Sequence, residues 1–201
     1  MIAAFGGASV DGSVYRDVVH LAGRAPGWLD TAATLWSAYG LGLFAVLMVW
    51  GWWRARRAGA EAALTALAVP ALVIVACAVD LLVKSAVREA RPCRSLHLAT
   101  LEACPAPGDW SFPSNHAAIA AAAAVALWFV SRRLGVLAGV AALVMAASRV
   151  WVGAHYPHDV AAGAAVGAAV AWAGMLVLRR CPLLARRLAA SRLRPLLLAA
   201  S

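Results

Sequence analysis

The segment from Ser148 to Asp159 reads SRVWVGAHYPHD and is the most informative part of the chain. It follows one long apolar run and precedes another, so it predicts a short polar turn between two apolar helices. Within it, Arg149 supplies a fixed cation, His155 an imidazole, and Asp159 a carboxylate four residues further on. Together these groups can bind a phosphate and attack it. Histidine–acid pairs are common, so the stretch alone is only suggestive of catalysis.

The composition predicts a membrane protein. Of the 201 residues, 64% are hydrophobic and 13% are charged, and the mean hydropathy is +0.78. A soluble domain would be about half apolar, whereas here the charges cluster between apolar runs. We therefore predict an all-α, polytopic membrane helical bundle with about five transmembrane helices. The expected spans are 31–53, 60–83, 114–130, 134–150 and 157–178.

Both ends of the chain are expected to lie on the membrane surface. Val14, Val18 and Leu21 share one face of a helix, which suits a short N-terminal interfacial helix. A disordered lead-in is the alternative. Asp30 is the expected N-cap of the first span. The predicted organisation is an outer-face interfacial segment (1–30), a membrane-embedded domain (31–180) and a basic cytoplasmic tail (181–201).

The distribution of charge predicts the orientation. If the spans alternate in direction, eleven arginines and one glutamate fall on one side, while seven cations and eight acids fall on the other. The positive-inside rule then puts the arginine-rich side and the C-terminus in the cytoplasm, and the N-terminus outside. The net charge of +9 is interpreted as a topology signal, and no nucleic acid is expected as a partner.

The candidate functional residues all fall on the predicted outer side. Lys84 and Arg91 are seven residues apart, which is two helical turns, so they would share one helix face. Ser114 is placed to cap the third span, whose free N–H groups would form an anion site, and His116 lies in its first turn. Pro157 suits the first turn of the fifth span. Ordinary caps and cations snorkelling to water are the alternatives for each feature alone, but several ionisable groups at one place favour function.

Three motifs, in this order, resemble the signature of the type 2 phosphatidic acid phosphatase superfamily. They are Lys84-x6-Arg91-Pro92, Pro113-Ser114-x-His116 and Ser148-Arg149-x5-His155-x3-Asp159. The similarity covers about residues 27–180. Within the superfamily, the chain looks most like the bacterial undecaprenyl-diphosphate phosphatases of the bacitracin-resistance type. Asn115 stands where the family usually has glycine, which puts the headgroup preference in doubt.

The resemblance implies a role for each residue. His155 would be the nucleophile, Asp159 would hold its imidazole in the attacking tautomer, and His116 would protonate the leaving group. The phosphoryl oxygens would be bound by the other residues of the motifs: Lys84, Arg91, Ser114, Asn115 and Arg149. No cofactor and no metal would be needed, because the cations supply the charge stabilisation. Arg88 and His158 lie outside the signature and are interpreted as bystanders.

The function implied is hydrolysis of undecaprenyl diphosphate to undecaprenyl phosphate and phosphate, at the outer face of the plasma membrane, through a phosphohistidine. The partners would be a prenyl or glycerol lipid phosphate and membrane lipids, and the oligomeric state is left open. Alternative substrates are phosphatidic acid and phosphatidylglycerol phosphate. An alternative of another class is a non-enzymatic lipid-binding or scaffold protein. A vanadate-dependent haloperoxidase would share the pocket, but the five spans disfavour it.

Cys93 and Cys104 bracket the polar loop that would lie over the pocket. Because this loop is predicted to face an oxidising compartment, we expect a disulfide that limits its motion. Two unpaired small residues are the alternative.

Overall fold

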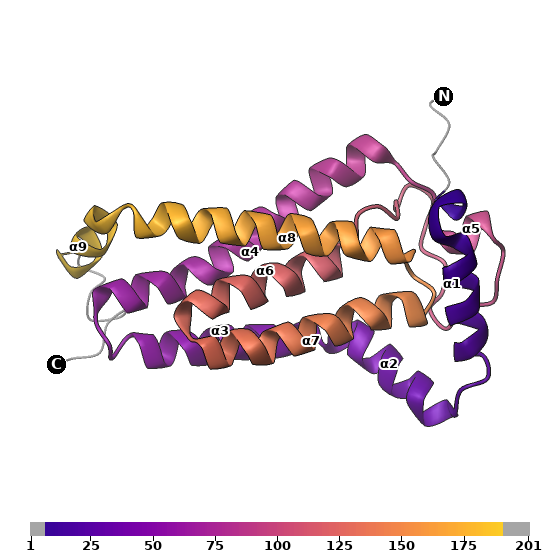
Figure 1. The fold of residues 1–201 in the computed structure, drawn as a ribbon, viewed down its shortest axis with the longest axis horizontal. Helices are drawn as coiled ribbons and strands as arrows, with labels where there is room; N and C mark the ends of the chain where they lie inside the picture. Colours follow the sequence, from indigo (N-terminus) through magenta and orange to yellow (C-terminus); the bar gives the residue numbers. More distant parts are fainter. Residues whose placement is uncertain (1–6, 191–201) are drawn as a thin grey trace.

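The computed structural model describes residues 7–190 (Figure 1). The C-terminal part of the predicted tail, 191–201, lies outside the described residues, as do residues 1–6. Between residues 7 and 190 the regular elements are helices, and the all-α prediction is confirmed. They are α1 (Ala8–Ala22), α2 (Gly27–Tyr39), α3 (Leu41–Ala55), α4 (Ala60–Val87), α5 (Pro92–Ser95), α6 (Asn115–Val130), α7 (Arg132–Trp151), α8 (Pro157–Arg179) and α9 (Pro182–Ala190).

Helices α4, α7 and α8 are each long and apolar enough to cross a membrane. The first predicted span is divided at Gly40 into α2 and α3, which are bent by 53° and pass the same test as a pair. The third predicted span is α6, a shorter apolar helix of 16 residues. All five predicted segments are therefore helical, but the first is bent and the third is short for a bilayer of about 30 Å.

The outer surfaces of the long helices are apolar. Val46, Ile74, Leu143 and Val177 are each more than 60% exposed. A water-soluble protein rarely exposes large apolar side chains in such numbers, whereas lipid tails solvate them. The apolar surface and the long apolar helices together make this a multi-pass membrane protein.

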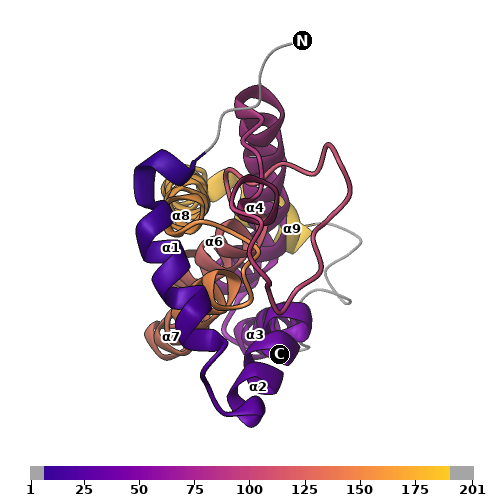
Figure 2. The same cartoon turned by 90° about the vertical axis from the view of Figure 1, so that its right-hand side faces the viewer.

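Helix α6 is the central helix of the bundle and contacts α3, α4, α7 and α8 (Figure 2). Its alanine-rich sequence lets these neighbours approach closely. In α8, a Cβ atom at Gly163 or Gly167 would collide with the backbone oxygen of Ser114 or Ala118. This glycine pair therefore brings α8 into close contact with α6, and it holds the first turn of α6 against the second and third turns of α8.

Helix α1 lies crosswise over one end of the bundle (Figures 1 and 2). The α4–α5 connection, the loop before α6 and the α7–α8 turn are at the same end, which we call the site end. Tyr15 of α1 donates a hydrogen bond from its hydroxyl to the carbonyl oxygen of Gly153, in the α7–α8 turn, at 2.8 Å. The N-terminal segment is thus an ordered helix that supports this turn, not a disordered lead-in.

The expected cap at Asp30 is wrong. Helix α2 begins at Gly27, after Pro26 at the N-cap position. Asp30 instead accepts a hydrogen bond on Oδ1 from the indole nitrogen of Trp151 at 2.9 Å. The side chain is therefore used for tertiary contact with α7, and the predicted segment boundary at residue 30 falls inside a helix.

Candidate active site

Three cationic side chains are buried at the site end. Lys84, Arg91 and Arg149 are 8%, 6% and 5% exposed. Burying a charge is costly unless it is paired or hydrogen-bonded, so three buried cations at one end of a bundle need a specific reason. We call the group formed by these cations with His155 and Asp159 the cup.

The imidazole of His155 is held between a guanidinium and a carboxylate. Its Nε2 lies 3.3 Å from Nη1 of Arg91, and its Nδ1 lies 3.4 Å from Oδ2 of Asp159. A guanidinium has only donors, so the Nε2 that faces it carries the lone pair. Nδ1 then carries the proton and donates toward the carboxylate. The tautomer with an unprotonated, cation-facing Nε2 follows from these two contacts.

Burial, followed by the charges of Arg91 and Arg149, lowers the pKa of His155 to about 3, although the hydrogen bond with Asp159 opposes part of this effect. The ring is 2% exposed. His155 is therefore neutral at ordinary pH and keeps the lone pair that a nucleophile requires.

Asp159 is fixed by local helix geometry and by one loop residue. Pro157 begins α8 as predicted, which makes Asp159 the third residue of that helix. Its Oδ2 accepts hydrogen bonds from the backbone N–H of Tyr156, at 2.8 Å, and from the hydroxyl of Ser111. The Ser111 hydroxyl also lies 3.5 Å from Nδ1 of His155. Ser111, Asp159 and His155 thus form one buried polar group at the floor of the cup.

Lys84 and Arg91 reach the cup by different routes, so the predicted shared helix face is wrong. Lys84 lies in the last turn of α4, which ends at Val87 because Arg88 adopts a left-handed conformation with φ of 54°. Arg91 follows this break and precedes α5. The side chain of Arg88 is exposed and donates to the carbonyl of Ser85, which agrees with its interpretation as a bystander.

Ser114 and Asn115 open helix α6 with free polar atoms. Ser114 occupies the N-cap position, but its hydroxyl makes no capping bond, so the expected cap is absent. The Ser114 Oγ and the Asn115 Oδ1 are buried and have no hydrogen-bond partner among residues 7–190. The helix ladder starts with the bond from the N–H of Ala118 to the carbonyl of Ser114, which leaves the N–H groups of residues 115–117 outside it. His116 lies in this first turn, half-buried.

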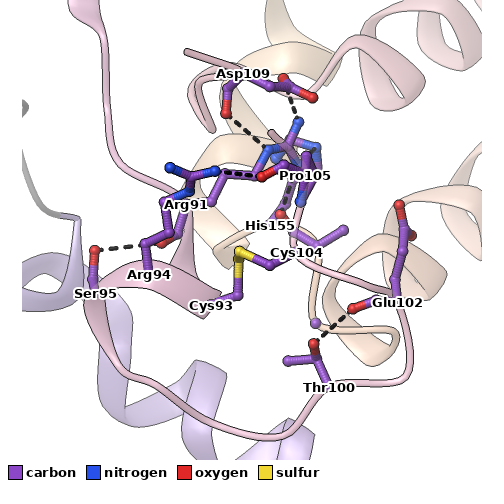
Figure 3. Close-up of a disulfide and its surroundings, with 12 residues drawn as sticks. Arg91, Cys93, Arg94, Ser95, Thr100, Glu102, Cys104, Pro105, Asp109 and His155 are labelled. Carbon is purple, nitrogen blue, oxygen red and sulfur yellow. Dashed lines mark hydrogen bonds and ion pairs between the residues drawn. A yellow bond between two sulfur atoms is a disulfide. The ribbon is translucent and has the colours of Figure 1, made fainter. Parts of the chain in front are cut away.

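Two of the buried cations bind the end of the loop that precedes α6, and Figure 3 shows one of them, Arg91, next to Asp109. Arg91 donates to Oδ1 of Asp109 at 2.8 Å and to the Asp109 carbonyl at 3.2 Å. Lys84 donates to the carbonyl of Trp110 at 3.1 Å. Partial burial raises the pKa of Asp109, but the hydrogen bond and charge of Arg91 outweigh it and hold the pKa below its usual value. Asp109 is therefore a carboxylate placed where a phosphate would also bind.

The third cation binds the same loop further back. Arg149 donates to Oε2 of Glu102 at 2.9 Å, and it also donates to the hydroxyl of Ser37 in α2. The loop is closed at its base by a disulfide between Cys93 and Cys104, with a Cα–Cα distance of 5.9 Å (Figure 3). The predicted disulfide is confirmed, and it holds the loop over the cup.

Several polar residues of the site end were not predicted. They are Ser37, Glu89, Glu102, Asp109 and Ser111. All of them reach the site from segments without a repeating pattern, apart from Ser37, which looks like an ordinary helix residue. The one usable signal was that Ser111 and Asp109 stand within five residues of the second motif. His158, interpreted as a bystander, also lies in this network and contacts Asp11 and Glu89.

Glu89, His158 and Asp159 offer ligand atoms within 4.8 Å of one another, a spacing that a metal ion can use. Each of these groups already has a protein partner: Glu89 contacts His158, His158 also contacts Asp11, and Asp159 faces His155. The group that faces Nε2 of His155 is the guanidinium of Arg91, which suits an anion.

The chain is similar to several known proteins. A family model described as "PAP2 superfamily" matches residues 62–182, which include all three motifs. Decaprenylphosphoryl-5-phosphoribose phosphatase of Mycobacterium tuberculosis is 42% identical over 97 residues, or 48% of this chain and 51% of that protein. Undecaprenyl-diphosphatase BcrC of Bacillus subtilis is 43% identical over 56 residues, or 28% of this chain and 29% of that protein.

The chain thus spans about half or less of the length of these curated relatives. Among solved structures, a transmembrane PAP2-type phosphatidylglycerolphosphate phosphatase from Bacillus subtilis matches with a TM-score of 0.67. The match has 19% identity and covers 86% of each chain. At this identity the match shows a shared fold.

Proposed function

The chain belongs to the PAP2 superfamily, and we propose that it is a membrane lipid phosphatase that works through a phosphohistidine. The observation that carries the proposal is the contact pair of His155, whose Nε2 faces Arg91 and whose Nδ1 faces Asp159. These two contacts favour an imidazole that is neutral and oriented for attack, and they place it next to Arg91, which would bind the phosphoryl group.

In the proposed reaction, Nε2 of His155 attacks the phosphorus, and the bond from phosphorus to the leaving-group oxygen breaks. His116 gives its proton to that oxygen. Asp159 stabilises the positive charge that develops on the His155 ring through the proton on Nδ1. A water then attacks the phosphohistidine and passes a proton to His116. The N–P bond breaks, and phosphate leaves.

The phosphoryl oxygens would be bound by the cations of the cup and by the start of α6. Lys84, Arg91 and Arg149 neutralise the charge, and the unpartnered hydroxyl of Ser114 adds a donor. Asn115 contributes its side-chain amide or its backbone N–H. Fixed donors in a site closed to water stabilise a phosphoryl transition state strongly. The proposed chemistry needs no metal or cofactor.

For the substrate we propose undecaprenyl diphosphate, because one of the relatives is named an undecaprenyl-diphosphatase. A groove of about 380 Å³ between α2 and α7 supports entry of the lipid from the side, since Trp36, Val144, Ser148 and Trp151 contribute to its apolar lining. Ser148 adjoins Arg149 in the sequence, so a chain lying in this groove would bring its headgroup to the cup.

We also propose that the site end faces the outside of the cell. The support is the charge distribution, because the opposite end carries exposed arginines in or next to the α3–α4, α6–α7 and α8–α9 connections. The positive-inside rule assigns that end, with α9, to the cytoplasm. A single cysteine placed at an exposed position of each end, labelled with an impermeant maleimide in intact cells, would test the orientation.

The test of the function is phosphate release by the purified protein from a panel of lipids. The panel contains undecaprenyl diphosphate, phosphatidic acid, phosphatidylglycerol phosphate and a decaprenylphosphoryl phosphoribose. We expect a kcat/KM for undecaprenyl diphosphate at least tenfold above the others. If another lipid of the panel had the highest kcat/KM, that lipid would be assigned as the substrate. No phosphate release from any lipid, or unchanged release by His155→Ala, would favour the non-enzymatic lipid-binding alternative.

A further inference from the structure

His158, the second residue of α8, contacts three carboxylates from three segments of the chain. Its Nδ1 lies 2.7 Å from Oδ1 of Asp11 in α1. Its Nε2 lies 3.0 Å and 3.2 Å from the two oxygens of Glu89, in the α4–α5 connection. The same Nε2 lies 3.4 Å from Oδ1 of Asp159.

The ring of His158 has little freedom to move. It is stacked near Tyr156, with ring centroids 5.4 Å apart, and near Phe112, with centroids 5.9 Å apart. The backbone N–H of His158 also donates to Oδ2 of Asp11 at 2.7 Å. A side chain at Gly7, just before α1, would collide with Glu89 and His158. Helix α1 therefore sits directly on this cluster.

The contact between His158 and Glu89 requires one proton, carried by the imidazole or by the carboxyl. Burial, followed by the charge of Asp159, raises the pKa of Glu89 to about 7. Glu89 is 1% exposed and Asp159 is fully buried. Without the imidazole between them, these two buried carboxylates would repel each other across a site with little water.

Asp159 therefore lies between two imidazoles. Its Oδ2 faces Nδ1 of His155, at 3.4 Å, and its Oδ1 faces Nε2 of His158, also at 3.4 Å. A rotation of the carboxylate that broke the first contact would break the second as well. Oδ1 accepts no hydrogen bond in the described part of the chain, so its contact with His158 is the ion pair that forms when this imidazole carries a positive charge.

We propose that His158 is a positioning residue, which ties α1 and the α4–α5 connection to α8 and keeps Asp159 aligned on His155. The proposal rests on the proposed role of His155 as the nucleophile. His158 does not touch the substrate, so its loss acts on the step that His155 performs and not on lipid binding.

The first test is His158→Ala in the full-length protein, with His20→Ala on the exposed side of α1 as the matched control. We expect kcat to fall about 10- to 100-fold, as for misplacement of a reacting group by a fraction of an ångström to 1 Å, while KM changes less than about threefold. His20→Ala should match the wild type. A wild-type kcat in His158→Ala, or a loss that appears in KM alone, would overturn the proposal.

The second test separates positioning from general loss of structure. In His158→Ala/Glu89→Gln, the carboxylate left unneutralised next to Asp159 is removed, so we expect kcat at least threefold above that of His158→Ala. A double variant no better than the single one would contradict the proposal. So would wild-type activity that is lost with a chelator and restored by a divalent cation, since the cluster would then be a metal site. His155→Ala tests the proposed function separately. If this variant kept its turnover, the proposed function would be wrong, whatever the result for His158.

Discussion

Both ends of the bundle carry clustered cations, but the two clusters are built differently. At the site end, Lys84, Arg91 and Arg149 are buried and donate to carboxylates, a hydroxyl and backbone carbonyls. At the other end, three of the arginines lie over aromatic rings. Arg56 is 4.4 Å from the ring centroid of Trp53, and Arg179 is 4.6 Å from that of Phe129.

The difference separates two uses of the same residue types. A guanidinium over an aromatic face near the membrane surface stays hydrated on one side and anchors the helix end. A guanidinium that is buried and held by hydrogen-bond acceptors on several sides is preorganised to bind an anion. We therefore expect changes at the site end to act on turnover, and matching changes at the arginine-rich end to have little effect.

The largest difference between the two ends should appear when one arginine at each end is replaced by alanine. Arg91→Ala removes the donor next to Nε2 of His155, and we expect kcat/KM to fall about 10²- to 10³-fold, as for the loss of one transition-state donor. Arg57→Ala removes an exposed arginine 5.7 Å from the ring centroid of Trp53 and should stay within about twofold of the wild type. Equal losses in phosphate-release assays would erase the distinction between the two ends.

A smaller difference is expected when one serine at each end is replaced by alanine. Ser111→Ala removes a hydrogen bond to the buried carboxylate of Asp159, and bonds to charged groups contribute about 1.5–3 kcal/mol. We expect kcat to fall about tenfold. Ser131→Ala, in the α6–α7 turn, removes a hydroxyl that makes no capping bond and should be neutral. Steady-state kinetics on both variants would show whether the floor of the cup depends on Ser111.

The acids of the two ends should differ in their effect on anion binding. Glu102 competes with a phosphate for Arg149, so Glu102→Gln should lower the inhibition constant of orthovanadate by about two- to fivefold. This is the size expected when an ion pair worth up to about 1 kcal/mol is removed. Glu61→Gln, at the opposite end, is the control and should change nothing. Weaker vanadate inhibition in Glu102→Gln would show that this residue supports the anion site.

The smallest effect concerns stability and pH. His155 has a depressed pKa in the folded protein, so the unfolded chain binds its proton first as the pH falls. Stability is therefore full above about pH 6.5, the ordinary value, and is lost as the pH falls toward about 3. Thermal unfolding between pH 7.5 and pH 5 should shift the melting temperature of the wild type more than that of His155→Gln. Parallel shifts would show that His155 is not the group responsible.

The sequence was sufficient for the helices and for the three motifs because both have strong local signals. Apolar length marked the spans, and the turn between α7 and α8 carried Arg149, His155 and Asp159 together. The pairing of Cys93 with Cys104 was also accessible, since both lie in one loop. These features depend on residues close together in the sequence.

The remaining contacts depend on how distant segments meet. Ser111 is 48 positions from Asp159, and Asp11 is 147 positions from His158, so no spacing in the sequence connects them. The route of Arg91 was missed because Arg88 takes a left-handed conformation that ends α4 early. The sequence could count the cations at both ends, but only the packing shows which of them are buried.

The most direct test of the central claim is to trap the covalent intermediate. The purified protein would be mixed with excess lipid diphosphate, quenched in alkali within milliseconds, digested and mapped by mass spectrometry, with His155→Ala alongside. We expect an acid-labile phosphate on His155 in the wild type and none in the variant. Phosphate on another residue, or rapid turnover with no phosphorylated residue at any quench time, would contradict it.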